Sequence, residues 1–424
     1  MANAIKKNIR PIKNFDATIG VPGSKSYTQR ALIVASLATG KSFIKGALIC
    51  EDSSHLINAL RLLGARISGS GCDLTVAGTG GKPSSPSAVI YLGNNGTGLR
   101  LLTGTVCLGD GTFVLDGSSR MRQRPIQPLV DALNKMGAEV ACINKSGCPP
   151  VRVMAKGLYG GNIAIEGGQS SQYLSSLLLA APYAGGDTEI KVEGKLASEP
   201  YVQITLDVMG SFGVEVSRTD NTFFIRAPQR YRPREYLIEG DASSATYFMA
   251  AAAICGGTVK ISNINPDSLQ GDLRFLNILE TLGCGIGRSE EGVQIVGPLC
   301  NHRDLCFDMN DVPDMVPALA VVSAFRRGGT VLKNIGHLRL KESDRIAAIS
   351  CELQKIGAKV EERPDEMIIQ GMATRGAEIE CYNDHRIAMS FAIAGLAIDG
   401  LVIKDPDCVR KSFPDFWEKL ESLG

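Results

Sequence analysis

The chain has 424 residues, 44% of them hydrophobic, and its 45 basic and 44 acidic side chains leave a formal net charge of +1. This length favours two domains, and the balanced charge, without a basic stripe, argues against nucleic-acid binding. No uncharged apolar run reaches the roughly 18 residues that span a membrane, and no apolar segment follows the charged start, so we expect a soluble cytoplasmic protein.

Cysteine and histidine give no indication of a metal site. The 12 cysteines are scattered without a C-x-x-C pair, and the four histidines form no H-E-x-x-H motif. We therefore expect most cysteines to be small buried residues and expect no bound metal.

An apolar residue followed by glycine recurs along the chain at a nearly constant interval. The glycines are Gly64, Gly137, Gly210, Gly283, Gly357 and Gly424, at intervals of 73, 73, 73, 74 and 67 residues. A β-branched segment follows each of the first five, so each glycine is expected to end a helix in the left-handed conformation. Repeats of this length exceed the roughly 20 to 50 residues of ordinary solenoid repeats, which makes a single solenoid the weaker interpretation.

Six segments between these glycines share a second pattern. Each begins with small polar residues, continues as a helix that is apolar on nearly all sides, and passes through a glycine-containing turn into a strand. Helices of this kind are expected to be buried beneath sheets. The last repeat has its helix at the end of the chain with no strand after it, so we expect the N-terminal strand near residues 5–12 to complete it.

Six repeats divide most simply into two domains of three. The first is expected at residues 22–236, and the second combines residues 1–21 with 237–424, so both termini lie in one domain. The predicted fold class is α/β, with two similar domains built from repeats around buried helices.

The first of the buried helices has an unusual start. Residues 21–30, VPGSKSYTQR, place Lys25 and Arg30 at the point where the apolar run begins. Backbone amides at a helix N-terminus attract anions, and two cations beside them would form an anion site. The segment is not a Walker A loop, because Ser24 separates Gly23 from the lysine. A solvated lysine beside an ordinary helix cap is an equally good interpretation of this segment alone.

Three further segments of the first half carry polar groups at helix starts. LGNNGTGLR at 92–100 offers bare backbone at Gly96 and a cation at Arg100, although such a turn is often only a turn. SRMRQRP at 119–125 packs three arginines into five residues, of which at least one is expected to bind phosphate or carboxylate. GQSSQY at 168–173 supplies neutral donors, which suit a phosphate or polyol or simply cap the helix.

The second half contributes carboxylates as well as cations. NDVPDMVP places Asp311 and Asp314 at a helix start, where they are caps unless Asp314 faces a cationic cleft and acts as a general base. RLKESDRI spaces Lys341 and Arg345 four apart on one face, which in isolation indicates a surface salt-bridge ladder. NDHRIAM and VRKSFPDF add a histidine and further cations. Because cations predominate in these segments of a nearly neutral chain, small multiply anionic ligands are expected.

Taken together, these segments resemble the 5-enolpyruvylshikimate-3-phosphate synthase family of enolpyruvyl transferases, over essentially the whole chain. The motifs are PGSKS at 22–26 with Arg30, GNNGTGLR at 93–100, RMRQRPI at 120–126, SSQY at 170–173, SEPY at 198–201, PD at 313–314, LKESDR at 340–345, NDHR at 383–386 and KSFPDF at 411–416. Nine motifs in the same order are highly specific.

The resemblance implies a fold, a reaction and a set of ligands. It implies two domains of three βαβαββ-type units each, the inside-out α/β barrel fold, closing over an interdomain cleft that holds the active site without metal or organic cofactor. The implied reaction transfers the enolpyruvyl group of phosphoenolpyruvate to the 5-hydroxyl of shikimate 3-phosphate and releases phosphate, in the biosynthesis of chorismate and aromatic amino acids. We expect a monomer with these two small-molecule substrates, no nucleic-acid partner and no membrane association.

The family's pattern also implies the role of individual residues. Phosphoenolpyruvate would be bound by Lys25, Gly96, Arg124, Gln172, Arg345, Arg386 and Lys411. Shikimate 3-phosphate would be bound by Lys25, Ser26, Arg30, Ser170, Ser171, Gln172, Ser198, Tyr201, Asp314, His337 and Lys341. Asp314 is the expected base for the hydroxyl, Glu342 the expected group for proton transfer at C3, and Lys25 the expected group for protons at the hydroxyl or the leaving phosphate.

Three residues depart from the family's usual pattern. Asn95 stands where alanine is common, Leu101 where proline follows the arginine, and His337 where an asparagine usually contacts the substrate phosphate. Asn95 and Leu101 are expected to reshape the turn that carries Gly96 and to alter the affinity for glyphosate, an inhibitor that occupies the phosphoenolpyruvate site. The contact made by His337 stays open.

Two other functions compete with this interpretation. The sister transferase that acts on UDP-N-acetylglucosamine shares the architecture, but it typically has Lys-Asn where this chain has Lys25-Ser26 and lacks a KSFPDF-like ending. A non-catalytic polyanion-binding protein on the same scaffold would lack the acid-base residues, whereas Asp314, Glu342 and Lys25 are all present.

Overall fold

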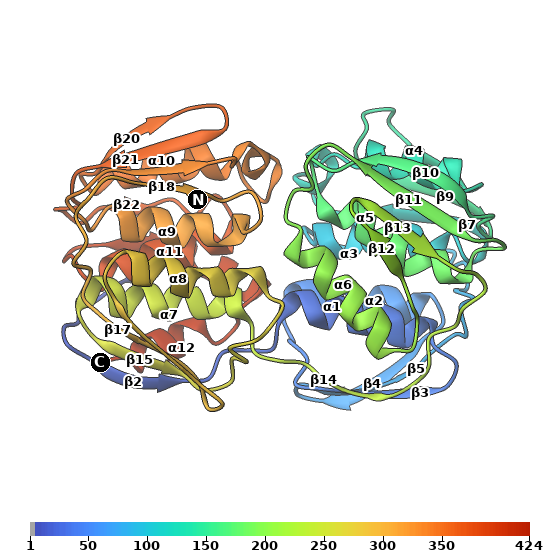
Figure 1. Ribbon diagram of the computed structural model, residues 1–424, viewed down its shortest axis with the longest axis horizontal. Helices are drawn as coiled ribbons and strands as arrows, with labels where there is room; N and C mark the ends of the chain where they lie inside the picture. Colours follow the sequence, from blue (N-terminus) through green and yellow to red (C-terminus); the bar gives the residue numbers. More distant parts are fainter. Residues whose placement is uncertain (1–4) are drawn as a thin grey trace. The chain divides into compact units, whose positions relative to one another are not determined.

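The computed structural model describes residues 5–424, which form two compact units (Figure 1). The central domain is Gly23–Ile238, and the split domain combines the residues up to Pro22 with Glu239–Gly424. The borders predicted from the sequence, after residues 21 and 236, differ from these by one and two residues. Within residues 5–424, no helix is both long and apolar enough to cross a lipid bilayer.

The central domain contains three sheets of four strands each, and all three follow one plan. In each sheet the first two strands are parallel and the remaining neighbours are antiparallel. The strand orders are β14 (Glu235–Leu237), β3 (Lys41–Lys45), β5 (Asp73–Ala77), β4 (Arg66–Ser70); β6 (Ile90–Tyr91), β7 (Asp110–Asp116), β9 (Val151–Lys156), β8 (Glu139–Cys142); and β10 (Gly161–Glu166), β11 (Thr188–Glu193), β13 (Thr222–Ile225), β12 (Ser217–Thr219).

The split domain repeats this plan. Its sheets are β16 (Gly285–Ser289), β17 (Gly292–Val296), β15 (Thr258–Ile261), β2 (Asp16–Ile19); β18 (Leu305–Asp308), β19 (Thr330–Lys333), β21 (Glu366–Gln370), β20 (Lys359–Glu362); and β1 (Lys6–Asn8), β23 (Val402–Lys404), β22 (Glu378–Ile379). Again one parallel pair begins each repeat.

Two classes of helix cover these sheets. The inner helices are α1 (Lys25–Leu37), α3 (Gly96–Val106) and α5 (Ser171–Ala180) in the central domain, and α7 (Ala242–Cys255), α9 (Val316–Ser323) and α11 (His385–Gly395) in the split domain. The outer helices are α2 (Glu51–Leu62), α4 (Gln127–Lys135) and α6 (Pro200–Ser211), and α8 (Arg274–Thr281), α10 (Arg345–Lys355) and α12 (Phe416–Glu421). Short 3₁₀ turns join some of them: η1 (Met121–Gln123), η2 (Ala181–Tyr183), η3 (Gly271–Leu273), η4 (Pro313–Met315), η5 (Gly336–Leu340) and η6 (Pro406–Lys411).

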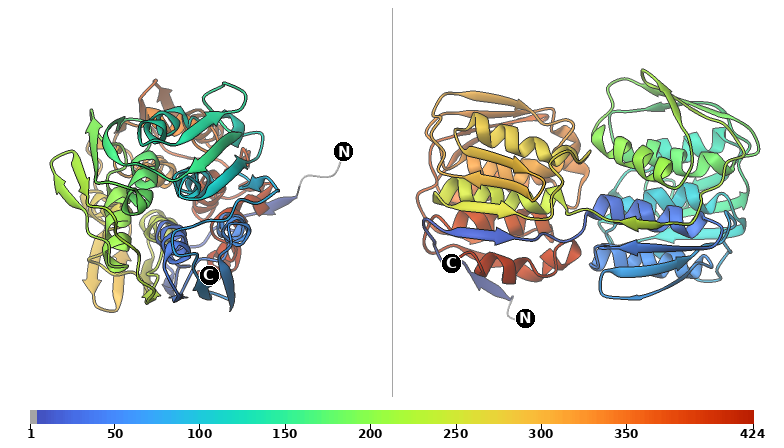
Figure 2. Two further views of the ribbon diagram at one scale, coloured as in Figure 1. Left: turned by 90° about the vertical axis from the view of Figure 1, so that its right-hand side faces the viewer. Right: turned by 60° about the horizontal axis from the view of Figure 1, so that its bottom comes forward.

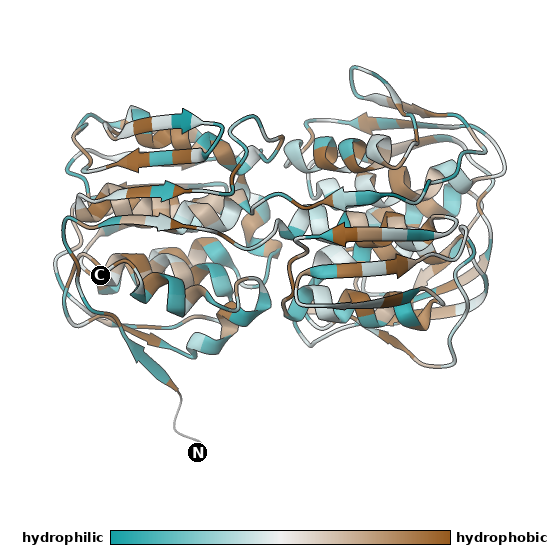
Figure 3. Cartoon of the chain, turned by 90° about the horizontal axis from the view of Figure 1, so that it is seen from below, coloured by the Kyte–Doolittle hydropathy of each residue, from teal (hydrophilic) through white to brown (hydrophobic). Residues whose placement is uncertain are grey.

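The inner helices form the centre of each domain. Every residue of α9 and α11 is buried, and α7 is buried except at its C-terminal end. Figures 1 and 2 show these three helices of the split domain running side by side, with strands outside them. Strands alternate hydrophobic and hydrophilic residues (Figure 3), as in β9, where Val151, Val153 and Ala155 are buried. The α/β class with buried helices, predicted from apolar runs without a polar face, is therefore confirmed.

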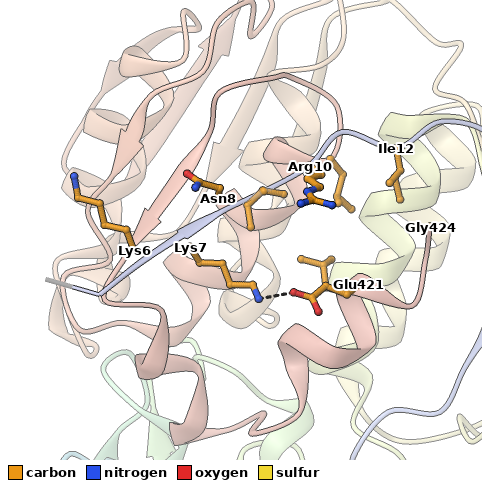
Figure 4. A pocket seen from close by; sticks show the side chains of 10 residues that line it. Lys6, Lys7, Asn8, Arg10, Ile12, Glu421 and Gly424 are labelled. Atoms are coloured by element: carbon orange, nitrogen blue, oxygen red, sulfur yellow. Dashed lines mark hydrogen bonds and ion pairs between the residues drawn. The ribbon is translucent and has the colours of Figure 1, made fainter.

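The sixth repeat is completed by the N-terminus. β1 pairs antiparallel with β23, with Lys6 opposite Lys404 and Asn8 opposite Val402. It occupies the place that a hairpin strand takes in the other five sheets, which confirms the prediction of an N-terminal strand in this repeat. Beside it lies a surface pocket of about 660 Å³, where Lys7 pairs with Glu421 (Figure 4). None of the predicted site residues lines this pocket.

Each crossing of the chain between domains exchanges a strand. β2 precedes α1 in the sequence but pairs in parallel with β15 of the split domain. In return, β14 precedes α7 but pairs in parallel with β3 of the central domain. The parallel strand that belongs to each of these two helices is thus supplied from far along the chain.

The recurring glycines end helices in four of the five predicted cases that can be compared. Gly64, Gly137, Gly283 and Gly357 have φ between 91° and 104°. The prediction for Gly210 is wrong, because α6 continues through that residue to Ser211. Gly213, three residues later, has a φ of 82° and makes the turn instead.

Candidate active site

The predicted site residues fall into two groups, one in each domain. The central cluster surrounds the N-terminal ends of α1, α3 and α5, and the split-domain cluster surrounds the starts of α9, α10 and α11. Each cluster is described within its own domain.

Close backbone packing fixes the start of α1. A Cβ atom on Gly23 would lie 2.0 Å from the carbonyl oxygen of Gly46, so only glycine fits there. Ser24 is the N-cap, and the Thr28 amide donates to its carbonyl at 2.9 Å. Lys25 is therefore the first helical residue, at the positive end of the helix.

Lys25 is held by a carboxylate from the neighbouring helix. Its Nζ lies 3.3 Å from Oδ2 of Asp52, and the two side chains are only 16% and 5% exposed. Asp52 belongs to the first turn of α2. Nothing in the spacing of the sequence singled out Asp52, because an acidic residue in the first turn of a helix is common.

Arg30 is a buried cation whose hydrogen-bond acceptors are neutral. Nε donates to Oγ1 of Thr205 at 2.7 Å, and the two terminal nitrogens donate to the carbonyls of Ser26 and Tyr201 at 3.1 Å each. Burial lowers the pKa of Arg30 to about 10, which still leaves it charged at neutral pH. The interior of the central domain therefore carries a full positive charge one turn below the start of α1.

Arg124 lies against the start of α3. Its guanidinium atoms lie 2.6 Å from the position of a Cβ on Gly96, so a side chain there would push the arginine away. Arg124 is 4% exposed and donates to the carbonyl of Asn94 at 3.2 Å. The bare backbone predicted at Gly96 thus makes room for the guanidinium.

The other two arginines of the same segment, Arg120 and Arg122, bind partners outside the start of α3. Arg122 pairs with Asp116 at 2.5 Å and is 53% exposed, and Arg120 bonds to Gln123 at 3.3 Å. Of the three candidates, Arg124 is the buried one.

Gln172 links α5 to α3. Its Nε2 donates to Oγ1 of Thr97 at 2.9 Å, and its Oε1 accepts from Arg100 at 2.8 Å. Ser170 caps α5 by accepting from the backbone amide of Gln172 at 3.3 Å. The sequence assigned no ligand to Arg100, and this hydrogen bond brings its guanidinium to the N-terminal end of α5.

Two further neutral candidates, Ser171 and Ser198, are also buried in the central cluster. Ser171 is the first residue of α5 and is 4% exposed, while Ser198 is 5% exposed and has a φ of 58°. A non-glycine residue with positive φ is uncommon and is often found at a functional turn. Tyr201 follows in the first turn of α6.

The departures Asn95 and Leu101 have different places in the domain. Asn95 is the N-cap of α3: its Oδ1 accepts from the amide of Gly98 and its Nδ2 donates to the carbonyl of Asp52, both at 2.8 Å. It therefore connects the turn carrying Gly96 to the residue that pairs with Lys25. Leu101 is fully buried in the hydrophobic core.

Arg345 is the centre of the split-domain cluster. It is 1% exposed and pairs with Asp384 at 2.9 Å, Asp314 at 3.0 Å and Glu342 at 2.9 Å. Burial alone would lower the pKa of Arg345, but the three carboxylates, led by Asp384, outweigh it and raise the pKa above its ordinary value. A guanidinium surrounded in this way is rigid and fully charged.

The geometry corrects the prediction that Lys341 and Arg345 share one helix face. Lys341 directly follows η5, and Arg345 is the first residue of α10, with irregular backbone between them. A surface salt-bridge ladder is excluded because Arg345 is buried.

Asp314 bridges two guanidiniums. Oδ1 pairs with Arg345 at 3.0 Å and Oδ2 pairs with Arg386 at 2.8 Å, while the side chain remains 22% exposed. It lies in η4 and makes no cap, and Asp311 pairs with Arg274 at 2.9 Å. The alternative reading of Asp314 as a helix cap is therefore wrong.

Asp272 is a carboxyl group that the sequence did not reveal. It is 5% exposed, lies in η3, and accepts a hydrogen bond from Ser243. Burial, followed by the charge of Asp314, raises the pKa of Asp272 to about 7, and Arg386 acts in the opposite direction. Asp272 thus shares an electrostatic environment with the predicted base. No periodicity or motif distinguishes it from other acidic residues near helix starts.

His337 and the two lysines complete this cluster. Burial and then Lys341 lower the pKa of His337 to about 3, so the imidazole is neutral at physiological pH. Its Nε2 is buried without a hydrogen-bond partner among the described residues. Lys411, the last residue of η6, is 6% exposed.

The residues of 5–424 contain no group of three or more His, Cys, Asp or Glu side chains arranged to hold a metal ion.

Comparison with known proteins decides the family. The sequence profile described as EPSP synthase (3-phosphoshikimate 1-carboxyvinyltransferase) matches residues 9–420. A protein of Syntrophobacter fumaroxidans named 3-phosphoshikimate 1-carboxyvinyltransferase is 44% identical over 424 residues, which cover 99% of this chain and 100% of that protein. The chain belongs to the EPSP synthase family.

Other relatives agree. The protein of the same name from Klebsiella pneumoniae is 42% identical over 98% of each chain. A crystal structure of EPSP synthase from Acinetobacter baumannii matches with a TM-score of 0.83 at 28% identity, covering 99% of this chain and 98% of that one. The two-domain α/β fold is therefore that of the EPSP synthase family.

The two clusters hold their buried arginines differently. In the central cluster, Arg30 donates to neutral oxygens. In the split-domain cluster, Arg345 and Arg386 pair with carboxylates.

Proposed function

We propose that this protein transfers the enolpyruvyl group of phosphoenolpyruvate to the 5-hydroxyl of shikimate 3-phosphate, with release of inorganic phosphate. Membership of the EPSP synthase family supports the reaction class, and the relatives' names specify the acceptor. The observation that carries the proposal for this chain is Asp314, a partly exposed carboxylate fixed between Arg345 and Arg386.

In the proposed mechanism, Asp314 and Glu342 each serve a different proton transfer. Asp314 accepts the proton of the 5-hydroxyl as the oxygen attacks C2 of phosphoenolpyruvate, while Glu342, which first takes up a proton from solvent, passes that proton to C3. The product of this addition is a tetrahedral adduct that carries both the ether and the phosphate. Glu342 then takes a proton back from C3 as the C2–O bond to phosphate breaks, which restores the double bond. Lys25 serves proton transfer at the hydroxyl or the departing phosphate.

Electrostatics supports both halves of this reaction. Phosphate and carboxylate groups keep their negative charge throughout, so buried guanidiniums lower the barrier most where charge concentrates on the departing phosphate. Residues of the two domains would share each substrate, and binding between the domains stays a prediction. For phosphoenolpyruvate we propose Lys25, Gly96, Arg124, Gln172, Arg345, Arg386 and Lys411.

Shikimate 3-phosphate would be held mostly by neutral donors and three cations. We propose Lys25, Ser26, Arg30, Ser170, Ser171, Gln172, Ser198, Tyr201, Asp314, His337 and Lys341. His337 would act as a neutral hydrogen-bond donor, because burial and the charge of Lys341 lower the pKa of its imidazole to about 3. Its buried Nε2 is available for that contact.

Phosphate release tests the proposal directly. The purified protein is incubated with both substrates in buffer containing a chelator, and with each substrate alone as a control. Release that requires both, with an enolpyruvyl ether as the second product, is expected. Release with UDP-N-acetylglucosamine in place of shikimate 3-phosphate would favour the sister activity. Binding of both anions without release would favour a non-catalytic anion-binding protein.

We further infer that the protein works as a monomer in the cytoplasm. The near-neutral composition and the small-molecule substrates support this inference. Sedimentation analysis at working concentration should give a single species of about 45 kDa, in line with the 45.1 kDa chain.

A further inference from the structure

A buried glutamate of α10 plays no part in the proposed chemistry. Glu352 lies on an outer helix of the split domain, yet its side chain is completely buried. Its carboxylate accepts hydrogen bonds from the hydroxyl of Tyr382 at 2.6 Å and from the backbone amide of Glu380 at 3.2 Å. Lys355 contacts both carboxylate oxygens, at 2.8 and 2.7 Å. Glu352 thus ties α10 to the segment that precedes α11.

That segment contains an uncommon backbone turn. Tyr382 and Asn383 are consecutive non-glycine residues with φ of 54° and 52°. Left-handed conformations cost free energy for residues with a Cβ and persist only where the surroundings fix them. The hydrogen bond from Tyr382 to Glu352 is such a constraint, since Tyr382 itself is 43% exposed and has little core packing to hold it.

The turn leads directly into the split-domain cluster. Asp384 follows it, is fully buried, and caps α11 by accepting from the amide of Arg386 at 3.0 Å. Its other oxygen accepts from Arg345 at 2.9 Å and from Ser343 at 3.0 Å. Asp384 therefore sets the position of the Arg345 guanidinium and of the backbone that carries Arg386, the two arginines that hold Asp314.

The protonation state of the Tyr382 hydroxyl is the one that a hydrogen-bond donor needs. Although much of the ring is exposed, partial burial at the hydroxyl end, followed by the hydrogen bond to Glu352, raises the pKa of Tyr382 above its ordinary value, so the hydroxyl keeps its proton. A proton on this oxygen is required for it to donate to the carboxylate.

We propose that Glu352 is a positioning residue for anion binding: by anchoring the Tyr382–Asn383 turn, it fixes Asp384 and, through it, Arg345 and Arg386. This inference rests on the proposed function, because it assigns the two arginines to phosphoenolpyruvate. A stabilising role alone would be better served by an apolar side chain, since burying a carboxylate carries a desolvation penalty.

Three variants test the proposal through the Michaelis constants. Tyr382→Phe removes one hydroxyl from a half-exposed side chain, Glu352→Ala removes the whole anchor, and Glu352→Gln keeps an acceptor for Tyr382. The KM for phosphoenolpyruvate should rise about tenfold in Glu352→Ala and about threefold in Tyr382→Phe, with kcat changed by less than about threefold. Glu352→Gln should lie closer to the wild type than Glu352→Ala does.

The next residue of the helix supplies a matched control. Leu353 is fully buried in the core and contacts the site through no hydrogen bond, so Leu353→Ala should lower the melting temperature without changing the KM for phosphoenolpyruvate by more than about twofold. Equal KM changes in Leu353→Ala and Glu352→Ala would overturn the inference, as would an unchanged KM in both Tyr382→Phe and Glu352→Ala.

Hydrogen exchange separates this inference from the proposed function. Amides of residues 382–387 should exchange faster in Tyr382→Phe than in the wild type, with no substrate present. If the wild-type protein fails to release phosphate, the proposed function is wrong, whereas unchanged exchange in these amides would contradict the anchor itself.

Discussion

The two clusters use arginine in opposite ways. In the central domain, Arg30 is buried and donates to backbone and hydroxyl oxygens. In the split domain, Arg345 is equally buried but is surrounded by three carboxylates, and Arg386 shares one of them. Similar repeats on one scaffold thus produce two electrostatic environments.

The difference indicates a division of labour. A buried guanidinium bonded to neutral oxygens retains a positive potential that an arriving phosphate can neutralise. A guanidinium paired with carboxylates can bind an anionic ligand too, and it also holds those carboxylates at fixed positions, as acid-base catalysis requires. We therefore expect changes in the central cluster to affect mainly KM, and changes at Asp314 to affect mainly kcat.

The largest effect is expected for Asp314→Asn. The amide preserves the shape of the side chain but cannot accept the hydroxyl proton, so kcat should fall by about 10³-fold. Phosphate release under saturating substrates measures this, with circular dichroism to confirm the fold. A loss of less than about tenfold would show that another group is the base.

Arg124→Lys should have the next largest effect. Lysine keeps the charge but loses the planar fork that lies against Gly96, so the KM for phosphoenolpyruvate should rise about 10- to 30-fold while kcat changes less. Steady-state kinetics with varied phosphoenolpyruvate measures both. A fall in kcat at unchanged KM would break the proposed division between the clusters.

Asp272→Asn should change how stability depends on pH. The pKa of Asp272 rises from 3.8 to about 7 on folding, so the folded protein resists its ionisation and the free energy of unfolding declines as pH rises from about 4 to 7. Asparagine removes this dependence. Between pH 4.5 and 8, the unfolding free energy of the variant relative to that of the wild type should rise by about 3 kcal/mol. Urea unfolding at both pH values measures it, and a shift in the opposite sense would mean that Asp272 is ionised at low pH.

Asn95→Ala is expected to have the smallest effect on stability. It removes the N-cap of α3 and the bond to the Asp52 carbonyl, which should lower the free energy of unfolding by about 1 kcal/mol. Urea denaturation measures this loss. The same variant should differ from the wild type in its inhibition by glyphosate, since Asn95 supports the turn that carries Gly96. If the wild type and Asn95→Ala have equal inhibition constants for glyphosate, both typical of a sensitive enzyme, then Asn95 has no role in glyphosate affinity.

Much of the fold was predictable because it is repeated. Apolar runs without a polar face identified the inner helices, and the glycine spacing identified the repeats. Gly210 was mistaken because the regular interval favoured it over Gly213, which lies in the same short segment and takes the left-handed conformation. The exchange of strands where the chain crosses between domains could not be predicted from the sequence, because β14 and β3 pair across about 190 residues.

The candidate site was predictable where motifs are dense. Lys25, Arg124 and Asp314 stand in such motifs, and the structure buries or pairs each of them. Asp52 and Asp272 were missed because a single acidic residue at a helix start is ordinary, and only the fold shows which cation it faces. Pairing of this kind depends on distance in space, which spacing along the chain does not encode.

The most direct test of the central claim is to measure shikimate 3-phosphate binding by Asp314→Asn with titration calorimetry, alongside its phosphate release. We predict a dissociation constant within about fivefold of the wild type, together with turnover reduced by at least about 100-fold. If binding and turnover fall by the same factor, Asp314 is a binding residue, and the proposed division between an anion-binding cluster and a proton-transfer cluster is wrong.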